Sequence, residues 1–337
     1  MVSSRISFSV VVIMALVAVF LSVFWAAANG STQIPVWRVA QGFFSCPFVS
    51  ECGLTAIEQQ ILWDIRLPRI LMALLTGAGL AVTGAILQSV TRNPLADPYL
   101  FGISSGAALG AVVAMSAFSG VVLSVTSGAL AGGALSVFLM LMLAGKSAIQ
   151  VEKLVLSGVA VSFMLSAFTS LVIYYSTPDT ATTLLFWLMG SFSGSDWSDL
   201  WLPFIVITAG SGLFFLFGRW LQVMQLGEDS AMTLGVPVYR LRLSMLIICS
   251  VITAVLVAEV GGIGFVGLMI PHIARLLIGA RLHRVLLLSL LIGAMFMIWV
   301  DMLAHTLLNN QVLPVGIVTS ALGSFFFFII LKRRQGR

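Results

Sequence analysis

Residues 66–90 read RLPRILMALLTGAGLAVTGAILQSV, and this stretch determines the class of fold. Arg66 and Arg69 stand at its start, and the next charged residue is Arg92, so the apolar run between them carries no charge. A helix needs about 20 apolar residues to cross the hydrocarbon core of a bilayer. The stretch therefore predicts a membrane-spanning helix that begins near Arg66 and ends before Arg92.

The rest of the chain has the same character. Of its 337 residues, 60% are hydrophobic and 9% are charged, and the mean hydropathy is +1.11. Soluble domains carry about a quarter charged residues, and a water-soluble core stops growing at about 250–300 residues. We therefore expect an all-α membrane protein with a single transmembrane domain over residues 1–337. The net charge of +5 is not gathered in a basic stripe, so we expect no nucleic-acid partner.

Apolar runs predict ten transmembrane helices. They lie near 7–28, 66–90, 99–118, 121–144, 153–175, 199–218, 241–258, 264–279, 285–304 and 314–331. The first run follows Arg5 and ends in Ala26–Ala28, which resembles a signal peptide with its cleavage site. Secretory hydrophobic regions have about 7–15 residues, and this run is longer, so we expect an uncleaved first helix. Residues 1–59 then hold that helix and an outer loop.

Lys and Arg determine the expected orientation, because cytoplasmic loops are enriched in both. With the N-terminus inside, only Arg38, Arg66 and Arg69 of the 17 basic residues stay outside. An even number of spans then places both termini in the cytoplasm. The membrane that we expect is the inner membrane of a bacterium.

Two outer loops are too long to be plain turns. Residues 29–65 contain Cys46 and Cys52, which an oxidising periplasm would allow to pair. The sequence leaves a disulfide and two free thiols equally open. Residues 176–198 include Phe186–Ser191, whose aromatic side chains suit an interfacial or re-entrant helix at headgroup depth.

The inner segment at residues 219–240 predicts two short helices. Gly227 precedes the acidic pair Glu228–Asp229, which would lie in a first helical turn, where the helix dipole favours negative charge. Gly235 is a helix stop signal, and Pro237 suits the first position of a second helix. An ordinary amphipathic connector would show the same signals, so these residues alone leave the role of the segment open.

Glycines at a spacing of four predict close packing between helices. Gly102, Gly106 and Gly110 would share one helical face, which lets a neighbouring backbone approach. Gly77 and Gly84, seven residues apart, would do the same on another helix. We expect packing at these positions, and lining of a pathway is the less favoured alternative.

Two further motifs bear on function. Arg92–Pro98 is a tight polar break between two apolar runs, and its two prolines disfavour helix at the residues before them. Gly145-Lys146-Ser147 resembles the end of a phosphate-binding loop, but that pattern needs a glycine five positions earlier, where this chain has Met140. We therefore expect that this chain is not an enzyme and does not hydrolyse ATP.

The titratable residues exclude several classes of site. His272, His283 and His305 share no metal-ligand spacing, so we expect no metal site. Asp301 and His305 are four apart and can pair on one helix. The acids closest to membrane depth are Glu259 and Asp301, both at outer ends of spans. This weakens an ion-coupled secondary transporter, which needs a buried carboxylate relay, and it leaves an intramembrane enzyme without converging groups.

Six motifs in their order and spacing closely resemble those of the FecCD-type permeases, over about residues 60–332. That family includes permeases that import vitamin B12, haem and ferric siderophores. The motifs are Arg66-Leu67-Pro68-Arg69; Arg92–Pro98; Gly102–Gly106; Leu226-Gly227-Glu228 with Leu234-Gly235-Val236; Gly264–Leu268 with Pro271–Arg275; and Leu313–Gly316.

The resemblance implies an assembly. It implies the fold of a type II ABC importer permease, in which spans two to five and seven to ten form an inverted repeat. Two copies of the permease would pair around a central pathway. Two ATPase subunits would dock on the inner side with ATP and Mg, and a periplasmic binding protein would deliver substrate from outside. This chain itself would bind no cofactor.

The resemblance also assigns roles to residues. Coupling to the ATPase would fall on Gly227, Glu228, Asp229, Ala231, Leu234 and Gly235. The cytoplasmic gate would contain Asn93, Pro94 and Leu95. Span five and residues 264–275 would lie near the pathway.

The resemblance also implies a docking role at the outer side. Arg66 and Arg69 would receive acidic residues of the binding protein, where opposite charges set orientation and on-rate, or would simply anchor the span at the headgroups. The family often has an arginine where this chain has His305, which makes a third docking contact doubtful or pH-dependent. The expected substrate is a ferric siderophore, then haem, then a corrinoid.

Overall fold

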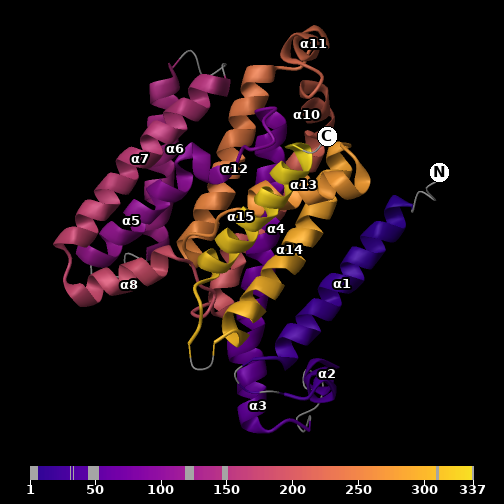
Figure 1. The fold of residues 1–337 in the computed structure, drawn as a ribbon, viewed down its shortest axis with the longest axis vertical. Helices are drawn as coiled ribbons and strands as arrows, with labels where there is room; N and C mark the ends of the chain where they lie inside the picture. The colour runs from indigo at the N-terminus through magenta and orange to yellow at the C-terminus, as the bar shows by residue number, and fades with distance from the viewer. Residues whose placement is uncertain are drawn as a thin grey trace.

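The computed structural model describes residues 7–30, 32, 34–44, 53–117, 125–145, 151–308 and 311–335. Within these ranges the chain is built from helices and contains no strand (Figure 1). The predicted all-α class is therefore confirmed.

Each of the ten predicted spans coincides with a helix. These helices are α1 (Phe8–Ala28), α4 (Leu67–Val90), α5 (Ile103–Ala117), α6 (Val125–Ala144), α7 (Val151–Tyr175), α9 (Trp201–Leu216), α12 (Val238–Val260), α13 (Val266–Ile278), α14 (Leu282–Thr306) and α15 (Val315–Gln335). Among the described residues, seven of them are long and apolar enough to cross a membrane. The apolar parts of α5, α13 and α15 are shorter.

Shorter elements connect these helices. They are α2 (Val36–Phe44), α3 (Ala56–Gln60), the π-helical turn η1 (Ile61–Arg66), the 3-10 turn η2 (Pro98–Phe101), α8 (Pro178–Leu188), the 3-10 turn η4 (Trp197–Leu200), α10 (Gly218–Met224) and α11 (Glu228–Thr233). The helix expected around Phe186–Ser191 exists as α8, but it begins earlier. It ends within that stretch because Gly190 takes a left-handed conformation, with φ at +77°.

Helix α4 lies at the centre of the fold and packs against α12, α13 and α14. From Thr76 to Val90 every one of its residues is buried. A Cβ added to Gly77 would lie 2.0 Å from the carbonyl oxygen of Gly293 on α14, and one added to Gly84 would lie 2.0 Å from that of Gly267 on α13. Small residues at both crossings therefore let the backbones touch, as the spacing of Gly77 and Gly84 predicted.

A second close crossing joins α5 to α6. A Cβ on Gly106 would lie 2.3 Å from the Gly132 carbonyl oxygen, and one on Gly110 would lie 1.9 Å from that of Gly128. Gly102 also faces α6, because a Cβ added to it would lie 2.8 Å from the Ser136 side-chain oxygen, but it is not part of helix α5. Gly102 precedes α5 and ends η2 in a left-handed conformation, with φ at +76°, where its lack of a Cβ lets the chain turn.

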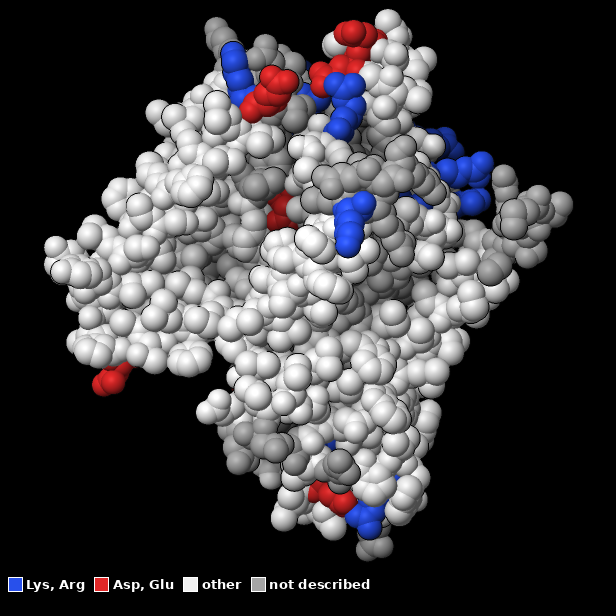
Figure 2. Space-filling model, in the orientation of Figure 1, with Lys and Arg blue, Asp and Glu red and all other residues white. Residues whose placement is uncertain are grey.

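The two ends of the molecule differ from its middle. The start of α1, the end of α15 and helices α10 and α11 all lie at one end, which we call the α11 end (Figure 1). Helices α2 and α3 lie at the opposite end, the α3 end. Charged side chains gather at these two ends, and the surface between them is largely uncharged on the face that Figure 2 shows. This distribution is that of a chain whose middle lies in hydrocarbon.

Backbone hydrogen bonds join three loops into one junction. Ser191 N–H donates to the Val260 carbonyl oxygen at the end of α12, at 3.0 Å. Val315 N–H and Gly316 N–H donate to the carbonyl oxygens of Gly190 and Met189, at 2.9 and 3.0 Å. The end of α8, the end of α12 and the start of α15 are thus held together.

The α5–α6 crossing gives a test of the packing. We expect Gly110→Ala to destabilise the protein by about 1–3 kcal/mol, because the added methyl group would overlap a carbonyl group of the main chain, which cannot move without distorting its helix. Gly212→Ala in α9 is the matched control, since no atom lies within 4 Å of its added Cβ. Thermal unfolding of the purified protein in detergent would measure both. Equal unfolding temperatures for the two variants would contradict the packing role of Gly110.

Candidate functional site

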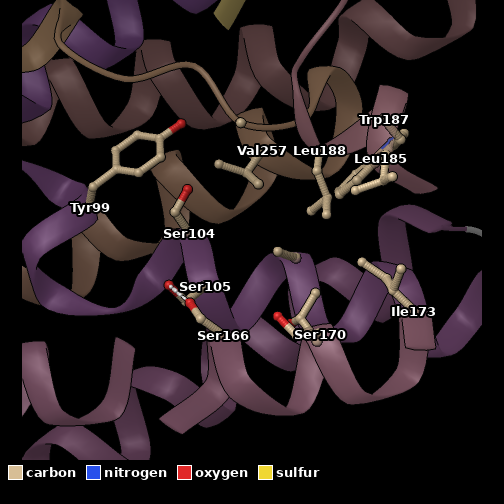
Figure 3. A pocket seen from close by; sticks show the side chains of 13 residues that line it. Tyr99, Ser104, Ser105, Ser166, Ser170, Ile173, Leu185, Trp187, Leu188 and Val257 are labelled. Carbon is tan, nitrogen blue, oxygen red and sulfur yellow. Dashed lines mark hydrogen bonds between the residues drawn. The ribbon is translucent and has the colours of Figure 1, made fainter. Parts of the chain in front are cut away.

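A pocket of about 330 Å³ lies where η2, α5, α7, α8 and α12 meet (Figure 3). Among the described residues that line it, six carry a hydroxyl group and none is charged. The hydroxyl groups belong to Tyr99, Ser104, Ser105, Ser166, Thr169 and Ser170, and the apolar part of the wall includes Ile173, Leu185, Trp187, Leu188 and Val257.

Two of the hydroxyl groups in this pocket contact each other, and a third binds the main chain of its own helix. Ser166 Oγ lies 3.2 Å from Ser105 Oγ, and the Thr169 hydroxyl donates to the Leu165 carbonyl oxygen at 2.9 Å. Hydroxyl groups both donate and accept, so this wall can exchange hydrogen bonds with neutral oxygen and nitrogen groups of a passing ligand. With no carboxylate, imidazole or thiolate in the wall, it does not offer the ligands that a metal ion prefers.

Sequence reasoning did not find this pocket, although it expected span five, which is α7, to lie near a pathway. The signal was present within α7. Ser166, Thr169 and Ser170 follow one another at spacings of three and one in the otherwise apolar stretch 163–173, which places their hydroxyl groups on one face. The remaining hydroxyl groups come from η2 and α5, and only the fold brings them to that face.

Arg66, at the end of η1, is buried, with 3% of its surface exposed. Its guanidinium donates to the carbonyl oxygens of Ala27 and Ala28 at the end of α1, at 2.6 and 3.3 Å, and to the Thr32 carbonyl oxygen. The last carbonyl groups of a helix have no partner within the helix, and a cation stabilises that end. Arg66 therefore fastens α1 to the start of α4.

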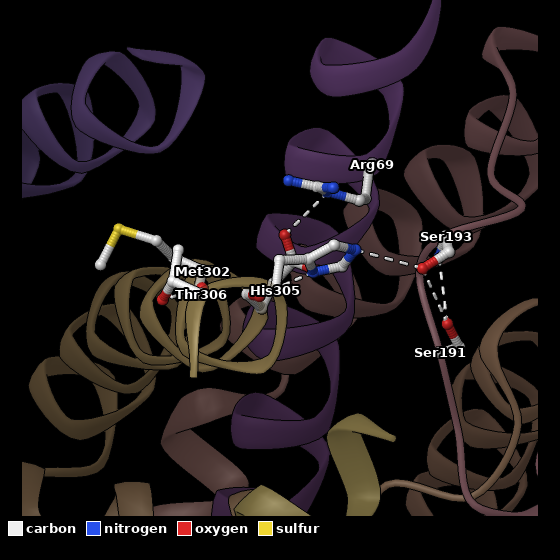
Figure 4. A network of polar contacts seen from close by, with 7 residues as sticks. Arg69, Ser191, Ser193, Met302, His305 and Thr306 are labelled. Atoms are coloured by element: carbon white, nitrogen blue, oxygen red, sulfur yellow. Dashed lines mark hydrogen bonds and ion pairs between the residues drawn. The ribbon is translucent and has the colours of Figure 1, made fainter. Parts of the chain in front are cut away.

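Arg69 belongs to a polar network between the start of α4 and the end of α14 (Figure 4). Its Nε lies 3.0 Å from Oδ2 of Asp301, which is 1% exposed. His305 Nδ1 lies 3.3 Å from Asp301 Oδ1, so the predicted pairing of these two residues is confirmed. His305 Nε2 lies 3.2 Å from the hydroxyl of Ser193, in the loop after α8.

These positions bear on the predicted docking role of Arg66, Arg69 and His305. All three side chains are largely buried and already have partners in this conformation. The anchoring alternative is the one that the geometry favours. A direct contact of these side chains with a docked protein stays a prediction, and it would require them to leave their present partners.

The polar turn between α4 and η2 has a defined geometry. The side chain of Asn93 accepts from the Leu95 N–H at 2.9 Å, and the Asn93 carbonyl oxygen accepts from the Ala96 N–H at 3.1 Å. Pro94 and Leu95 are exposed, and Arg92 in the same turn contacts Glu228 of α11. The turn is therefore held by its own hydrogen bonds, while its tip stays free to contact another chain.

Asp97 closes this turn as the N-cap of η2. Its Oδ1 accepts from the Tyr99 N–H at 2.9 Å, and the residue is 5% exposed. Burial raises the pKa of the Asp97 carboxyl from 3.8 to about 6, because the charged form loses its hydration, and the Tyr99 hydrogen bond offsets only part of this rise.

The segment at residues 218–240 follows the prediction only in part, because α10 was not expected and the second helix is the start of the long helix α12, with Pro237 as its N-cap. Helix α11 begins after Gly227 and ends at Thr233, and α12 begins directly after Pro237. Asp229, Leu234 and Gly235 are exposed, whereas Ala231 is fully buried. Of the residues expected to contact an ATPase, Ala231 therefore packs inside this chain and would act only through its neighbours.

The Glu228 carboxylate faces two arginines. Its Oε1 lies 2.6 Å from Arg242 Nη2 and 3.5 Å from Arg92 Nη2. The Arg242 side chain is 2% exposed, and the Arg92 side chain is 46% exposed. One acid of α11 is thus bound to the start of α12 and also reaches the turn after α4.

The described residues contain no group of three or more potential metal ligands among His, Cys, Asp and Glu. Cys249 is buried in α12, where packing was expected. Cys46 and Cys52 lie outside the described residues.

The buried ion pair at Arg69 distinguishes anchoring from docking. We expect Arg69→Ala to destabilise the protein by about 3–5 kcal/mol, because it leaves the Asp301 charge buried without its arginine. Arg38→Ala is the matched control. It breaks a partly exposed pair with Glu58, and such pairs contribute little to stability because water screens them. Thermal unfolding in detergent would measure both, and an Arg69→Ala variant as stable as wild type would contradict the anchoring role.

The pKa of Asp97 predicts a dependence of stability on pH. An acid whose pKa is higher in the folded state than in the unfolded state favours folding at low pH, and this contribution is lost as the pH rises from about 4 through 6. Over this range the free energy of unfolding of wild type should fall by up to about 3 kcal/mol relative to that of Asp97→Asn. Unfolding measured from pH 4 to 7 would test this, with the exposed Asp229→Asn as control. A wild type and an Asp97→Asn variant with parallel pH profiles would contradict it.

Comparisons with known proteins agree with this geometry. Residues 14–333 match the FecCD transport family. The chain is 41% identical over 287 residues to the cobalamin import system permease protein of Halobacterium salinarum, covering 85% of this chain and 77% of that one. It is also 41% identical over 278 residues to a protein of Helicobacter pylori described as a probable iron chelatin transport system permease, covering 82% and 83%.

A solved structure gives the same result. It is described as an inward-facing conformation of an ABC transporter assigned to the metal-chelate type. It superimposes with a TM-score of 0.85 at 30% identity, covering 96% of this chain and 99% of that one. The family match spans nearly the whole chain, and the relatives cover more than two thirds of it. The chain therefore belongs to the FecCD transport family.

Proposed function

We propose that this chain is the membrane-spanning permease subunit of an ATP-binding-cassette importer for a metal chelate. The observation that carries the proposal is the superposition of 96% of the chain on a transporter assigned to the metal-chelate type. ATP hydrolysis would belong to a separate subunit, which agrees with the incomplete phosphate-loop pattern at Gly145-Lys146-Ser147.

The seven long apolar helices and the shorter α5, α13 and α15 would all cross the membrane as one transmembrane domain, with the α11 end in the cytoplasm. Both termini and most basic residues would then lie inside, as the distribution of Lys and Arg favours. The chain would be an inner-membrane protein of a bacterium, because the periplasmic delivery of substrate requires that location.

An inverted repeat relates the two halves in this proposal. Helices α4 to α7 would correspond to α12 to α15, and the first helix of each half would pack against the second and third helices of the other half. The contacts support it, because α4 packs on α13 and α14 while α12 packs on α5 and α6. Inverted repeats of this kind are common among transporters, and substrate passes near the interface between the halves.

The partners follow from the same proposal. A second copy of this chain would complete the pathway, and exposed apolar side chains on α7 are available for that contact or for lipid. They include Leu156, Phe163, Phe168, Leu171, Tyr174 and Tyr175. Two ATPase subunits, which bind ATP and Mg, would dock at the α11 end. A periplasmic binding protein would dock at the α3 end.

Residue roles are assigned accordingly. The exposed residues Asp229, Leu234 and Gly235 of the α11 segment would contact the ATPase, with Gly227, Glu228 and Ala231 shaping the segment from within. Asn93, Pro94 and Leu95 would form part of the cytoplasmic gate. Gly106 and Gly110 would keep the helices around the pathway in contact.

A ferric siderophore is the substrate that we place first, followed by haem and a corrinoid. The hydroxyl-lined wall beside α7 and α8 favours a chelate that is rich in neutral oxygen and nitrogen groups over a large apolar ring. The relatives alone do not rank these classes, since this chain is 41% identical both to a cobalamin permease and to a protein described as an iron chelatin permease.

An ion-coupled secondary transporter is the alternative. It would need carboxylates that are free to titrate within the membrane. Of the two acids expected closest to membrane depth, Asp301 is the buried one, and its carboxylate is paired with Arg69 at 3.0 Å. This pairing favours the ATP-driven mechanism.

Uptake into proteoliposomes tests the proposal. The permease would be reconstituted with its ATPase and binding protein and offered a ferric siderophore, haem and a corrinoid in turn. We expect uptake of the siderophore only when ATP is hydrolysed, with a non-hydrolysable ATP analogue as control. Uptake that persists without ATP and stops when an ionophore collapses the ion gradient would contradict the importer and support the secondary transporter. Uptake of haem or the corrinoid instead would change the substrate and leave the mechanism standing.

A further inference from the structure

The carboxylate of Glu228 connects two features that the proposed function assigns to different tasks. Helix α11 belongs to the segment expected to contact the ATPase, and the turn at residues 91–97 contains the expected gate. Glu228 stands in the first turn of α11, and Arg92 stands directly before Asn93. The two features are 136 residues apart in sequence, and this ion pair brings them together in space.

The two arms of the Glu228 contact differ in strength. The arm to Arg242 is short, at 2.6 Å, and ends on a buried side chain at the start of α12. The arm to Arg92 is longer, at 3.5 Å, and ends on a side chain that is 46% exposed. A partly exposed ion pair at this distance is weak. The first arm therefore fixes α11 on α12, and the second is the one that can break and re-form.

The backbone of Arg92 supports a specific role for this side chain. Its φ is +50°, in the left-handed region that residues other than glycine rarely adopt. Such conformations persist where the surrounding structure holds them, and they gather at functional positions. Here the conformation turns the chain at the end of α4, and the guanidinium of Arg92 reaches the carboxylate of Glu228.

A second contact runs parallel to the first. Gln225 Nε2, just after α10, donates to the hydroxyl of Ser89 near the end of α4 at 3.1 Å. A cavity of about 260 Å³ adjoins this contact, and Ser89, Arg92 and Gln225 all line it. The segment that carries α10 and α11 thus touches the end of α4 through polar side chains around an open space, which leaves room for a small displacement.

We propose that Glu228 and Arg92 are positioning residues that link the movement of α11 to the turn at residues 91–97, while Arg242 keeps α11 seated on α12. A displacement of α11 that lengthens or shortens the 3.5 Å contact changes its electrostatic energy. A docked ATPase would exclude water from the contact and strengthen this dependence. The link rests on the proposed function, because it needs a partner that moves α11.

The test compares transport with ATP hydrolysis in the reconstituted complex. We expect Arg92→Gln to hydrolyse ATP at close to the wild-type rate and to lower the number of substrate molecules taken up per ATP by about fivefold, at the lower end of measured coupling effects because the pair is partly exposed. Arg92→Lys keeps the charge and should recover part of this ratio. Arg281→Gln is the matched control, since Arg281 is exposed at the same end of the molecule.

A double-mutant cycle separates a link from two independent effects. If Glu228 and Arg92 act through each other, Arg92→Gln combined with Glu228→Gln should lower the ratio no further than Glu228→Gln alone. The link would be overturned if the double variant took up fewer substrate molecules per ATP than Glu228→Gln alone, by a factor equal to the effect of Arg92→Gln. It would also be overturned if Arg92→Gln and Arg281→Gln took up the same number of substrate molecules per ATP. A wild-type complex without ATP-dependent uptake would overturn the proposed function, and the link with it. Co-purification of the ATPase with each variant confirms that the complex has assembled.

Discussion

The close contact of α4 with α13 and α14 is the constraint on which the rest of the fold depends. Lipid tails are as apolar as the side chains that they meet, so the hydrophobic effect does not drive helices together inside a bilayer. Direct contact between backbones must supply the packing instead. Glycine faces glycine at both crossings, Gly77 with Gly293 and Gly84 with Gly267, and any Cβ there would overlap a carbonyl group. These close contacts bury α4 at the centre of the fold, where α12, α13 and α14 pack around it.

Charged groups then fasten the elements that the central packing does not hold. Helix α1 buries only Ser22 and three alanines at its end, Ala26 to Ala28. The guanidinium of Arg66 binds the carbonyl groups at that end, and the Trp299 indole donates to the Ser22 hydroxyl at 3.0 Å. At the opposite end of the molecule, Glu228 plays a comparable part for α11. In both places one buried arginine joins a peripheral helix to a central one.

Much of this architecture could be predicted from the sequence. The ten apolar runs coincide with helices, and the limits of α11 follow from Gly227 and Gly235. These features depend on local patterns, on which backbone preference and side-chain hydrophobicity act directly. The pairing of Asp301 with His305 is likewise local, since it needs only one turn of helix.

Other features depend on neighbours that are distant in sequence. The local sequence is the same whether an arginine at the start of a span faces water or another helix, so the burial of Arg66 and Arg69 could not be predicted from it. The ladder of three glycines was only partly correct, because α5 begins after Gly102. The hydroxyl-lined pocket draws its residues from η2, α5 and α7, and the link between Glu228 and Arg92 spans 136 residues. None of these pairings has a signature within one helix.

The loop junction of α8, α12 and α15 has a consequence for how such a chain can diversify. It is made by amide and carbonyl groups of the main chain, so replacing a side chain does not remove its hydrogen bonds. Trp187 and Leu188, which line the pocket, lie directly before Met189 of the junction. Residues that meet a ligand can therefore be exchanged while the scaffold beside them stays closed. Insertions and deletions in these loops carry the opposite expectation, since they would shift the register of the main chain and open the junction itself.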